Sequence, residues 1–274
     1  MKQRTITALC GIPVLVAFIW YDTSRFPLLI LLIAGFVALG ALEFYHLATV
    51  SGARPLTAFG VVWCLLFIIG AHLDANYEVD YLIPSLLASA AVLPLVWFLL
   101  SSSQRSFVSW SWTLAGILYL GWMLGYYVAL RERDYGREWV ILAIFCVFAC
   151  DTAAFFVGRA WGKRHLAPTI SPKKTWEGAI GGFVATPAAA VIIYALLNVA
   201  DLSLPTGYTQ IVLLGCLVGV VAQLGDLLES WLKRRAGVKD SGSLLPGHGG
   251  ILDRIDSLVI TGAVIYYYVV WVVG

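Results

Sequence analysis

Long apolar runs, each close to the length of a membrane-spanning helix, constrain this chain more than any other feature of its sequence. A helix needs about 20 mostly apolar residues to cross the hydrocarbon core of a bilayer. Polar breaks separate nine such runs, at about residues 6–20, 27–48, 56–73, 81–100, 111–130, 138–158, 178–199, 208–232 and 252–273. We therefore predict an all-α fold, a polytopic integral membrane bundle of about nine transmembrane helices.

The composition also argues against a large soluble domain. Hydrophobic residues make up 60% of the 274 and charged residues 12%, against about 45–50% and about 25% in soluble domains. Nine spans would take about 180 residues, so no sizeable extramembrane domain is expected. The first run follows two cationic residues, as in a secretory signal, but no A-x-A cleavage site comes after it, and we expect a retained anchor. The net charge of +2 gives no reason to expect a nucleic-acid partner.

The distribution of Lys and Arg predicts the orientation. If the N-terminus is cytoplasmic, 14 of the 18 Lys and Arg fall on the cytoplasmic side, and the other side keeps Arg25, Arg131, Arg133 and Arg137. Cytoplasmic loops of membrane proteins carry such an excess of positive charge. We predict a multi-pass protein of the inner (plasma) membrane, with the N-terminus and the active site facing the cytoplasm. The two most polar loops, 159–177 and 233–251, then lie on that side.

Ionisable residues divide the chain into two parts. Within the spans they lie almost entirely in the second half, so we predict an amino-terminal region, 1–135, for packing and lipid access, and a catalytic region, 136–274. Glu43 is the exception, and its place near the end of a span favours a helix-end role. Small-x-x-x-small glycine pairs indicate closely packed helices and would allow a homodimer, without revealing an interface. These pairs are Gly121 and Gly125, Gly178 and Gly182, and Gly215 and Gly219.

Three spans of the second half carry carboxylates at a similar depth. Asp151 lies eight residues before Arg159, and Asp226 lies seven before Lys233. At 1.5 Å per residue, both are about 10–12 Å below the cytoplasmic boundary. Asp253 lies at the start of the last span. Each such charge costs about 2.5–3.5 kcal/mol at the centre of a membrane helix, so each requires a reason.

Gathered carboxylates repel one another unless they are protonated or bind a cation. Oxygen ligands without Cys or His favour Mg²⁺ over zinc, and the number of carboxylates leaves room for a second cation. We predict Asp226, Asp253 and Asp151 as metal ligands. The sequence leaves open an alternative, in which each aspartate forms a structural ion pair with a Lys or Arg.

Two basic loops accompany these acids. Loops 159–177 and 233–251 hold nine of the 18 Lys and Arg, and topology alone explains part of this excess. In the first loop, Pro172 is expected to fix a turn before Lys173 and Lys174. Residues 158–163 resemble a P-loop, but one residue is missing between the glycines and no Ser or Thr follows the lysine. Neither H-E-x-x-H nor G-x-S-x-G occurs, which argues against a zinc protease and a hydrolase elbow.

The second loop ends in glycines. Gly249 and Gly250 come just before a helix that we expect to begin at about Ile251. Backbone N–H groups at such a helix start bind anions, which suits a phosphate. The sequence leaves open whether His248 shapes this turn or contacts the phosphate.

Residues of both loops resemble the motifs of one family. The longer motif runs Ser230-Trp231-Leu232-Lys233-Arg234, Lys239-Asp240, Gly242, Leu245-Pro246-Gly247-His248-Gly249-Gly250 and Asp253-Arg254-Ile255-Asp256. Complete over 27 residues, it resembles the signature of the phosphatidate cytidylyltransferase (CDP-diacylglycerol synthase) family. The shorter one, Ser171-Pro172-Lys173-Lys174-Thr175 to Glu177-Gly178, resembles that family's second motif. The similarity covers about residues 145–274, and the residues before that resemble the family only in their apolar helices.

The resemblance implies that phosphatidate attacks the α-phosphorus of CTP, giving CDP-diacylglycerol and pyrophosphate in phospholipid biosynthesis. A phosphomonoester with a second pKa of about 6 is largely a dianion at pH 7, so no strong general base is needed. The resemblance favours Asp226 and Asp253 as direct Mg²⁺ ligands and Asp151 as a third. We predict as catalytic residues Lys239, Asp240, His248, Arg254 and Asp256, and as substrate-binding residues Ser171, Lys173, Lys174, Lys233, Arg234, Gly249 and Gly250.

Three other functions are compatible with parts of this pattern. A CTP-dependent polyprenol or lipid kinase would give a phosphorylated product without cytidine. An ion-coupled transporter would also carry carboxylates in its membrane helices, but transporters usually show two related halves, and no internal repeat is apparent. A non-catalytic scaffold would not need paired acids beside basic glycine loops.

Overall fold

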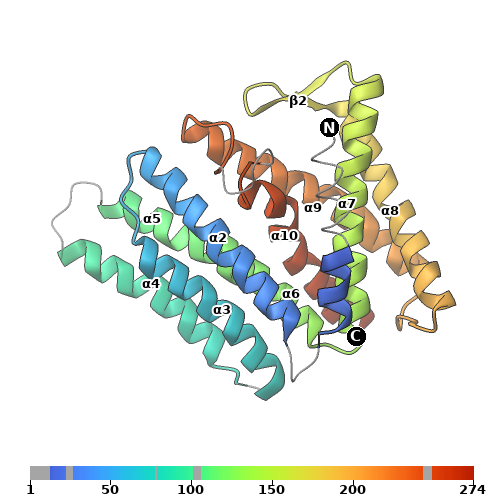
Figure 1. The fold of residues 1–274 in the computed structure, drawn as a ribbon, viewed down its shortest axis with the longest axis horizontal. Helices are drawn as coiled ribbons and strands as arrows, with labels where there is room; N and C mark the ends of the chain where they lie inside the picture. Colours follow the sequence, from blue (N-terminus) through green and yellow to red (C-terminus); the bar gives the residue numbers. More distant parts are fainter. Residues whose placement is uncertain (1–12, 23–26, 78, 101–105, 243–248) are drawn as a thin grey trace. The chain divides into compact units, whose positions relative to one another are not determined.

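The computed structural model describes residues 13–22, 27–77, 79–100, 106–242 and 249–274 (Figure 1). Helices form nearly all of it. They are α2 (Leu28–Val50), α3 (Thr57–Tyr77), α4 (Leu82–Leu100), α5 (Ser106–Gly116), η1 (Ile117–Trp122), α6 (Met123–Arg131), α7 (Gly136–Trp161), α8 (Trp176–Val199), α9 (Tyr208–Arg235), α10 (Leu252–Tyr268) and η2 (Val269–Val273).

Eight stretches of the described chain are helical, long and apolar enough to cross a membrane. Six are single helices, while α5, η1 and α6 form one stretch and α10 with η2 forms another. The prediction of an all-α, polytopic membrane protein is confirmed. The expected first span, 6–20, lies mostly outside the described residues, although residues 13–20 are helical.

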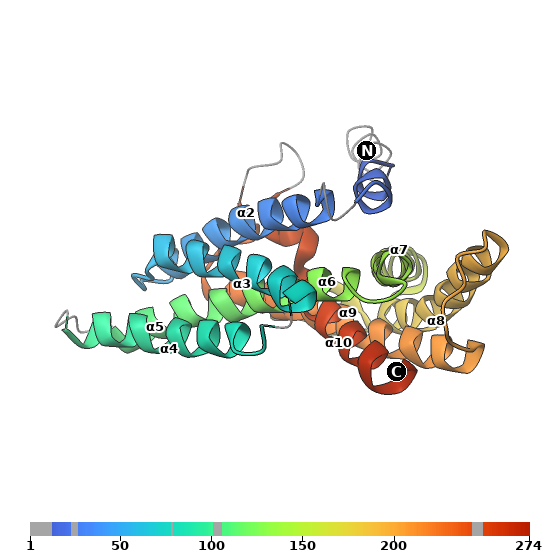
Figure 2. The same cartoon turned by 90° about the horizontal axis from the view of Figure 1, so that it is seen from below.

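The chain forms two compact units. The first contains Met1–Glu132 and Leu232–Ile255, and the second contains Arg133–Trp231 and Asp256–Gly274. Within the first, α3 contacts both α2 and α4, and α4 contacts α5 (Figure 2). The division after Glu132 lies close to the boundary that we predict at 135, but segment 232–255, which we grouped with the second half, packs with the amino-terminal helices.

Glycines bring the helices of each unit together, as their spacing predicts. In the second unit, Gly182 of α8 lies against Cys150 of α7, and a Cβ on Gly215 of α9 would lie 2.5 Å from the Cα of Pro187 in α8. In the first unit, a Cβ on Gly121 would lie 2.6 Å from the Cα of Cys64 in α3. The glycine pairs therefore serve packing within this chain.

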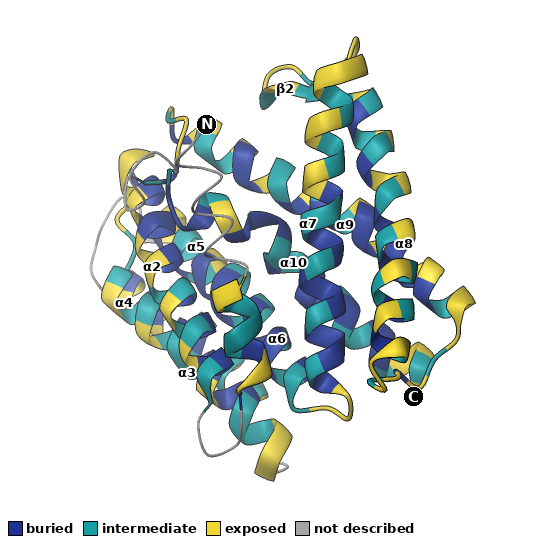
Figure 3. Ribbon diagram, turned by 45° about the vertical axis from the view of Figure 1, so that its right-hand side comes forward, coloured by how far each residue is buried: buried dark blue, intermediate teal, exposed yellow. Residues whose placement is uncertain are grey.

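Helix α7 changes character along its length (Figure 3). Its buried residues fall between Gly136 and Cys150. From Asp151 to Trp161, every residue is half-buried or exposed. The carboxylate that the sequence places within this span therefore lies where the helix leaves the buried interior of its unit.

Loop 159–177 folds as an antiparallel hairpin of β1 (His165–Ala167) and β2 (Ser171–Thr175). Our expectation for Pro172 is wrong, because this residue lies in β2 and not in a turn. A two-stranded sheet has only edge strands, where a residue without an N–H is tolerated. The hairpin leads directly into α8, where the Thr175 hydroxyl accepts a hydrogen bond from the N–H of Gly178 at 3.2 Å.

A substitution at Gly225 would test the contact between α9 and α10 in the second unit. A Cβ on Gly225 would lie 2.6 Å from the backbone oxygen of Asp256, closer than real Cβ contacts allow. We expect Gly225→Ala to lower the free energy of unfolding by about 1–3 kcal/mol, the usual cost of overpacking. Gly35→Ala is the matched control, because a Cβ on Gly35 meets nothing within 4 Å and alanine stabilises a helix by about 0.5–1 kcal/mol. Equal melting of the two variants in detergent would contradict this contact.

Candidate active site

The second unit brings two predicted metal ligands and one predicted substrate-binding residue together. Asp226 comes from α9, Lys174 from strand β2 and Asp151 from α7. Nζ of Lys174 lies 2.6 Å from Oδ2 of Asp226. Asp151 interacts electrostatically with both Asp226 and Lys174. The hairpin thus places the ammonium group of Lys174 beside carboxylates that belong to membrane-spanning helices.

Two serines complete this group of side chains. Oγ of Ser230, one helical turn after Asp226 in α9, lies 3.4 Å from Oδ1 of Asp226. Oγ of Ser257 in α10 lies 3.4 Å from Oδ1 of Asp151. We call Asp151, Lys174, Asp226, Ser230 and Ser257 the Asp151–Asp226 cluster.

The carboxylates of this cluster are accessible. Asp151 is exposed, and the side chains of Asp226 and Lys174 are 31% and 25% exposed. A ligand can therefore reach these oxygens without unfolding the unit.

The cluster offers hard oxygen donors that suit Mg²⁺. This cation is usually held by one or two carboxylates, with water and substrate phosphates completing its coordination. Asp151 and Asp226 supply such a pair. Among the described residues, no group of three or more His, Cys, Asp and Glu is arranged to hold a metal ion. The predicted magnesium site therefore stays a prediction, with Asp151 and Asp226 as its candidate ligands.

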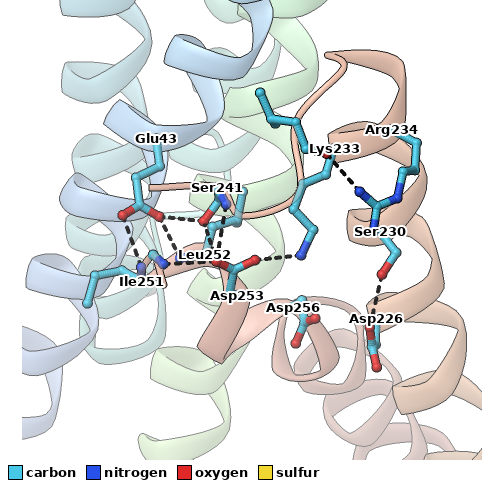
Figure 4. A network of polar contacts seen from close by, with 12 residues as sticks. Glu43, Asp226, Ser230, Lys233, Arg234, Ser241, Ile251, Leu252, Asp253 and Asp256 are labelled. Atoms are coloured by element: carbon cyan, nitrogen blue, oxygen red, sulfur yellow. Dashed lines mark hydrogen bonds and ion pairs between the residues drawn. The ribbon is translucent and has the colours of Figure 1, made fainter. Parts of the chain in front are cut away.

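The first unit contains a second polar network, centred on Asp253 (Figure 4). Nζ of Lys233 lies 2.5 Å from Oδ1 of Asp253. Oδ2 of Asp253 accepts hydrogen bonds from the N–H of Gly250 at 2.8 Å and from the N–H of Ser241 at 3.1 Å, and Oγ of Ser241 lies 3.1 Å from the same oxygen. These contacts fix both oxygens of Asp253 at the start of α10.

Glu43 of α2 belongs to the same network, although sequence reasoning gave it only a helix-end role. Its Oε1 accepts the N–H of Ile251 at 3.0 Å, and its Oε2 accepts the N–H of Leu252 at 2.9 Å and the hydroxyl of Ser241 at 2.9 Å (Figure 4). We call Glu43, Lys233, Ser241, Gly250 and Asp253, with these two backbone N–H groups, the Glu43–Asp253 network. The first half of the chain thus contributes a side chain to this network.

The network changes how the glycine-rich helix start is interpreted. We expected its N–H groups to bind a phosphate. In the structure, the N–H groups of Ile251 and Leu252 donate to Glu43, and that of Gly250 donates to Asp253. The anions at this helix start are thus carboxylates of the chain itself. The ion pairs that the sequence left open are also present, between Asp226 and Lys174 and between Asp253 and Lys233.

The other predicted residues differ in burial and in their contacts. Asp256 is buried, and its Oδ1 accepts the N–H of Ser257 at 2.7 Å. Arg234 donates to the backbone oxygen of Val238 at 3.0 Å. Ser171 and Gly249 are half-buried, His248 lies outside the described residues, and the exposed residues are Lys173, Lys239, Asp240 and Arg254. These assignments stay predictions.

Comparison with known proteins gives this site its context. A sequence model of the "Cytidylyltransferase family" matches residues 2–272. The chain belongs to this family. The phosphatidate cytidylyltransferase of Brucella suis biovar 1 is 35% identical over 271 residues, covering 98% of this chain and 93% of the relative. That of Bacillus subtilis is 33% identical over 272 residues, covering 97% of each, and that of Synechocystis is 31% identical over 299 residues, covering 98% and 96%.

Membership of the cytidylyltransferase family extends further along the chain than the motifs indicated. We limited the resemblance to about residues 145–274, but the family match begins at residue 2. That expectation is wrong, because apolar helices carry few residues that a motif can recognise by eye. The signal that could have found Glu43 is its charge, because an acid within an apolar span is costly and requires a partner.

Proposed function

We propose that this membrane protein is a phosphatidate cytidylyltransferase, which transfers the cytidylyl group of CTP to phosphatidate and releases pyrophosphate. The observation that carries the proposal is the match to the cytidylyltransferase family over nearly the whole chain, with relatives of that name at 31–35% identity. The relatives named above give no support to a kinase or a transporter.

The chemistry fits a site built from cations and carboxylates. A phosphate oxygen of phosphatidate forms a bond to the α-phosphorus of CTP, while the bond from that phosphorus to the pyrophosphate oxygen breaks. The attacking phosphate is already largely a dianion at pH 7, so the protein supplies position and charge and not a strong base. Nζ of Lys174, 2.6 Å from Oδ2 of Asp226, can turn to a substrate phosphate.

Asp226 and Asp151 would hold the predicted Mg²⁺, and Asp253 remains a predicted ligand. When bound, Mg²⁺ supplies positive charge to phosphate oxygens. The chain's own part is to orient the donors: Ser230 contacts Asp226, and Ser257 contacts Asp151. A second cation remains compatible with this number of carboxylates.

The orientation belongs to this proposal as well. CTP comes from the cytosol, so we place the hairpin and the Asp151–Asp226 cluster on the cytoplasmic side of an inner membrane, with the N-terminus on the same side. The excess of Lys and Arg in loops 159–177 and 233–251 supports this choice. The acyl chains of phosphatidate would stay in the leaflet. The glycine pairs serve helix packing within the chain. A homodimer therefore stays a prediction that these contacts do not support.

The test is an assay of the purified protein in mixed micelles, with cytidine-labelled CTP and phosphatidate, with and without Mg²⁺. We expect metal-dependent appearance of cytidine in the lipid extract. Diacylglycerol and polyprenol replace phosphatidate in parallel samples as acceptor controls. Consumption of CTP without cytidine in the lipid would contradict the proposal in favour of a kinase.

Asp151→Asn should reduce activity without abolishing it. Oδ1 of Asp151 lies 3.4 Å from Oγ of Ser257, and among the described residues Asp151 has no ion pair like that of Asp226 with Lys174. We therefore expect its replacement to cost less activity. We expect turnover to fall by about tenfold, less than for Asp226→Asn, with a higher Mg²⁺ concentration needed for half-maximal rate. Wild-type turnover at limiting Mg²⁺ would remove Asp151 from the metal site.

A further inference from the structure

Glu43 is a buried carboxylate in the membrane-spanning helix α2, with only 5% of its surface exposed. Burying a charge is unfavourable unless hydrogen bonds satisfy it. Three donors do so here: the N–H groups of Ile251 and Leu252, and the hydroxyl of Ser241. These donors lie 198 to 209 residues further along the chain. Glu43 therefore holds two points of one distant segment, Ser241 before it and the start of α10 after it.

The backbone of that segment is shaped to admit the Glu43 side chain. A Cβ on Gly242 would lie 2.5 Å from Oε1 of Glu43, and one on Gly250 would collide with Oε2 of Glu43 and with Oγ of Ser241. Any side chain at either position would displace the carboxylate. Two glycines of the signature segment thus make room for a residue of α2, which points to a built arrangement and not to a chance contact.

Ser241 connects Glu43 to Asp253. Its Oγ lies 2.9 Å from Oε2 of Glu43 and 3.1 Å from Oδ2 of Asp253. The same Oδ2 accepts the N–H groups of Ser241 and Gly250, which leaves Oδ1 directed at Lys233. The rotamer of Asp253, and hence the place of the Lys233 ammonium, depends on a segment that Glu43 fixes from the other end.

We propose that Glu43 is a positioning residue for cytidylyl transfer: through Ser241 and the first N–H groups of α10 it holds Asp253 and Lys233 in their working geometry. The inference rests on the proposed function, because it assigns Asp253 and Lys233 to that reaction. It gives the amino-terminal region a part in catalysis. Hydrogen bonds from surrounding residues orient the carboxylates of a metal site. Their removal commonly lowers the activity or the metal affinity of such a site by about 10- to 100-fold.

The test compares Glu43→Gln with Glu138→Gln. Both residues are buried glutamates, each 5% exposed, in membrane-spanning helices, and Glu138 pairs with its neighbour Arg137. The substitution keeps the size of the side chain but gives Glu43 an amide group that faces a backbone donor. Each variant is assayed for cytidylyl transfer over a range of Mg²⁺ concentrations. Hydrogen exchange is measured without metal or substrate on peptides that cover residues 249–252.

We expect Glu43→Gln to raise the Mg²⁺ concentration for half-maximal rate by about tenfold or more, and Glu138→Gln to leave it unchanged. That concentration does not depend on the fraction of folded enzyme, so a merely structural role would not move it. Exchange at residues 249–252 should be faster in Glu43→Gln alone. Equal effects of the two glutamine variants, or unchanged metal dependence and exchange in Glu43→Gln, would overturn the proposal.

Ser241→Ala keeps the test valid if Glu43→Gln does not fold. It removes the hydroxyl between the two carboxylates and leaves the N–H of Ser241 on Asp253. We expect a shift of the metal dependence in the same direction, and an unchanged metal dependence in Ser241→Ala would overturn the proposal. Where Glu43→Gln folds, the double variant Glu43→Gln with Ser241→Ala should show less than the product of the two single effects, since both act through one connection. Fully independent effects would overturn the proposal. If the wild type transfers no cytidylyl group, the proposed function fails, and exchange alone then reports whether Glu43 holds this segment.

Discussion

Asp226→Asn is expected to abolish cytidylyl transfer while the protein remains folded. Its carboxylate faces Lys174 at 2.6 Å and is the predicted ligand at the centre of the Asp151–Asp226 cluster. Replacing it by an amide removes one negative charge and leaves the Lys174 ammonium beside a neutral group. Losing one electrostatic stabiliser of a transition state commonly costs about 10²–10³ in turnover, and we expect a loss of at least about 100-fold.

Asp201→Asn is the matched control for this change. Asp201 is exposed in the turn after α8 and has a φ of 56°, a conformation that asparagine tolerates as well as aspartate does. The same chemical substitution should leave turnover unchanged there. The measurement is turnover per folded protein, with folding checked by thermal melting in detergent. Turnover of Asp226→Asn within about threefold of the wild type would remove Asp226 from the site.

Asp253→Asn is the second substitution with a large expected effect. The side chains of Asp253 and Lys233 are each 12% exposed, and removing one partner of a buried pair costs roughly 3–5 kcal/mol of stability. An asparagine would also turn an amide group toward either Lys233 or the donors of Ser241 and Gly250. We expect turnover to fall by at least about 100-fold and the melting temperature to drop.

The double variant Asp253→Asn with Lys233→Met separates a structural ion pair from a site. If the two residues only neutralise each other, removing both charges should restore stability and activity together. We expect stability to recover in part, because no buried charge is left without its partner, and turnover to stay low, because both residues serve the reaction. Recovery of turnover in the double variant would contradict the role that we assign to Asp253.

The sequence predicted the elements of this protein well because the membrane imposes strict rules on them. Each of the eight apolar runs that fall in the described part of the chain forms a helical stretch long and apolar enough to cross a membrane. Counting residues placed Asp151 and Asp226 inside two apolar stretches, and both lie within long helices, α7 and α9. Their depth in the membrane stays a prediction. The glycine pairs also correctly predicted close contacts between helices, since close helix approach requires small residues.

The contacts that sequence reasoning missed are those made between distant segments. Nothing near Glu43 in the sequence indicates that its partners are Ser241 and the start of α10. The glycine-rich helix start was correctly recognised as an anion-binding element, but the anion that it binds in this structure belongs to α2. Pro172 was assigned to a turn because proline often occurs there, whereas an edge strand accepts it equally well.

The most direct test of the central claim is to measure which phosphate group of CTP is transferred to the lipid. Two parallel reactions contain the purified protein, phosphatidate, Mg²⁺ and CTP labelled at either the α- or the γ-phosphate. We predict that the α-label enters the lipid extract and that the γ-label appears in pyrophosphate. Entry of the γ-label into the lipid would contradict cytidylyl transfer and identify the enzyme as a kinase.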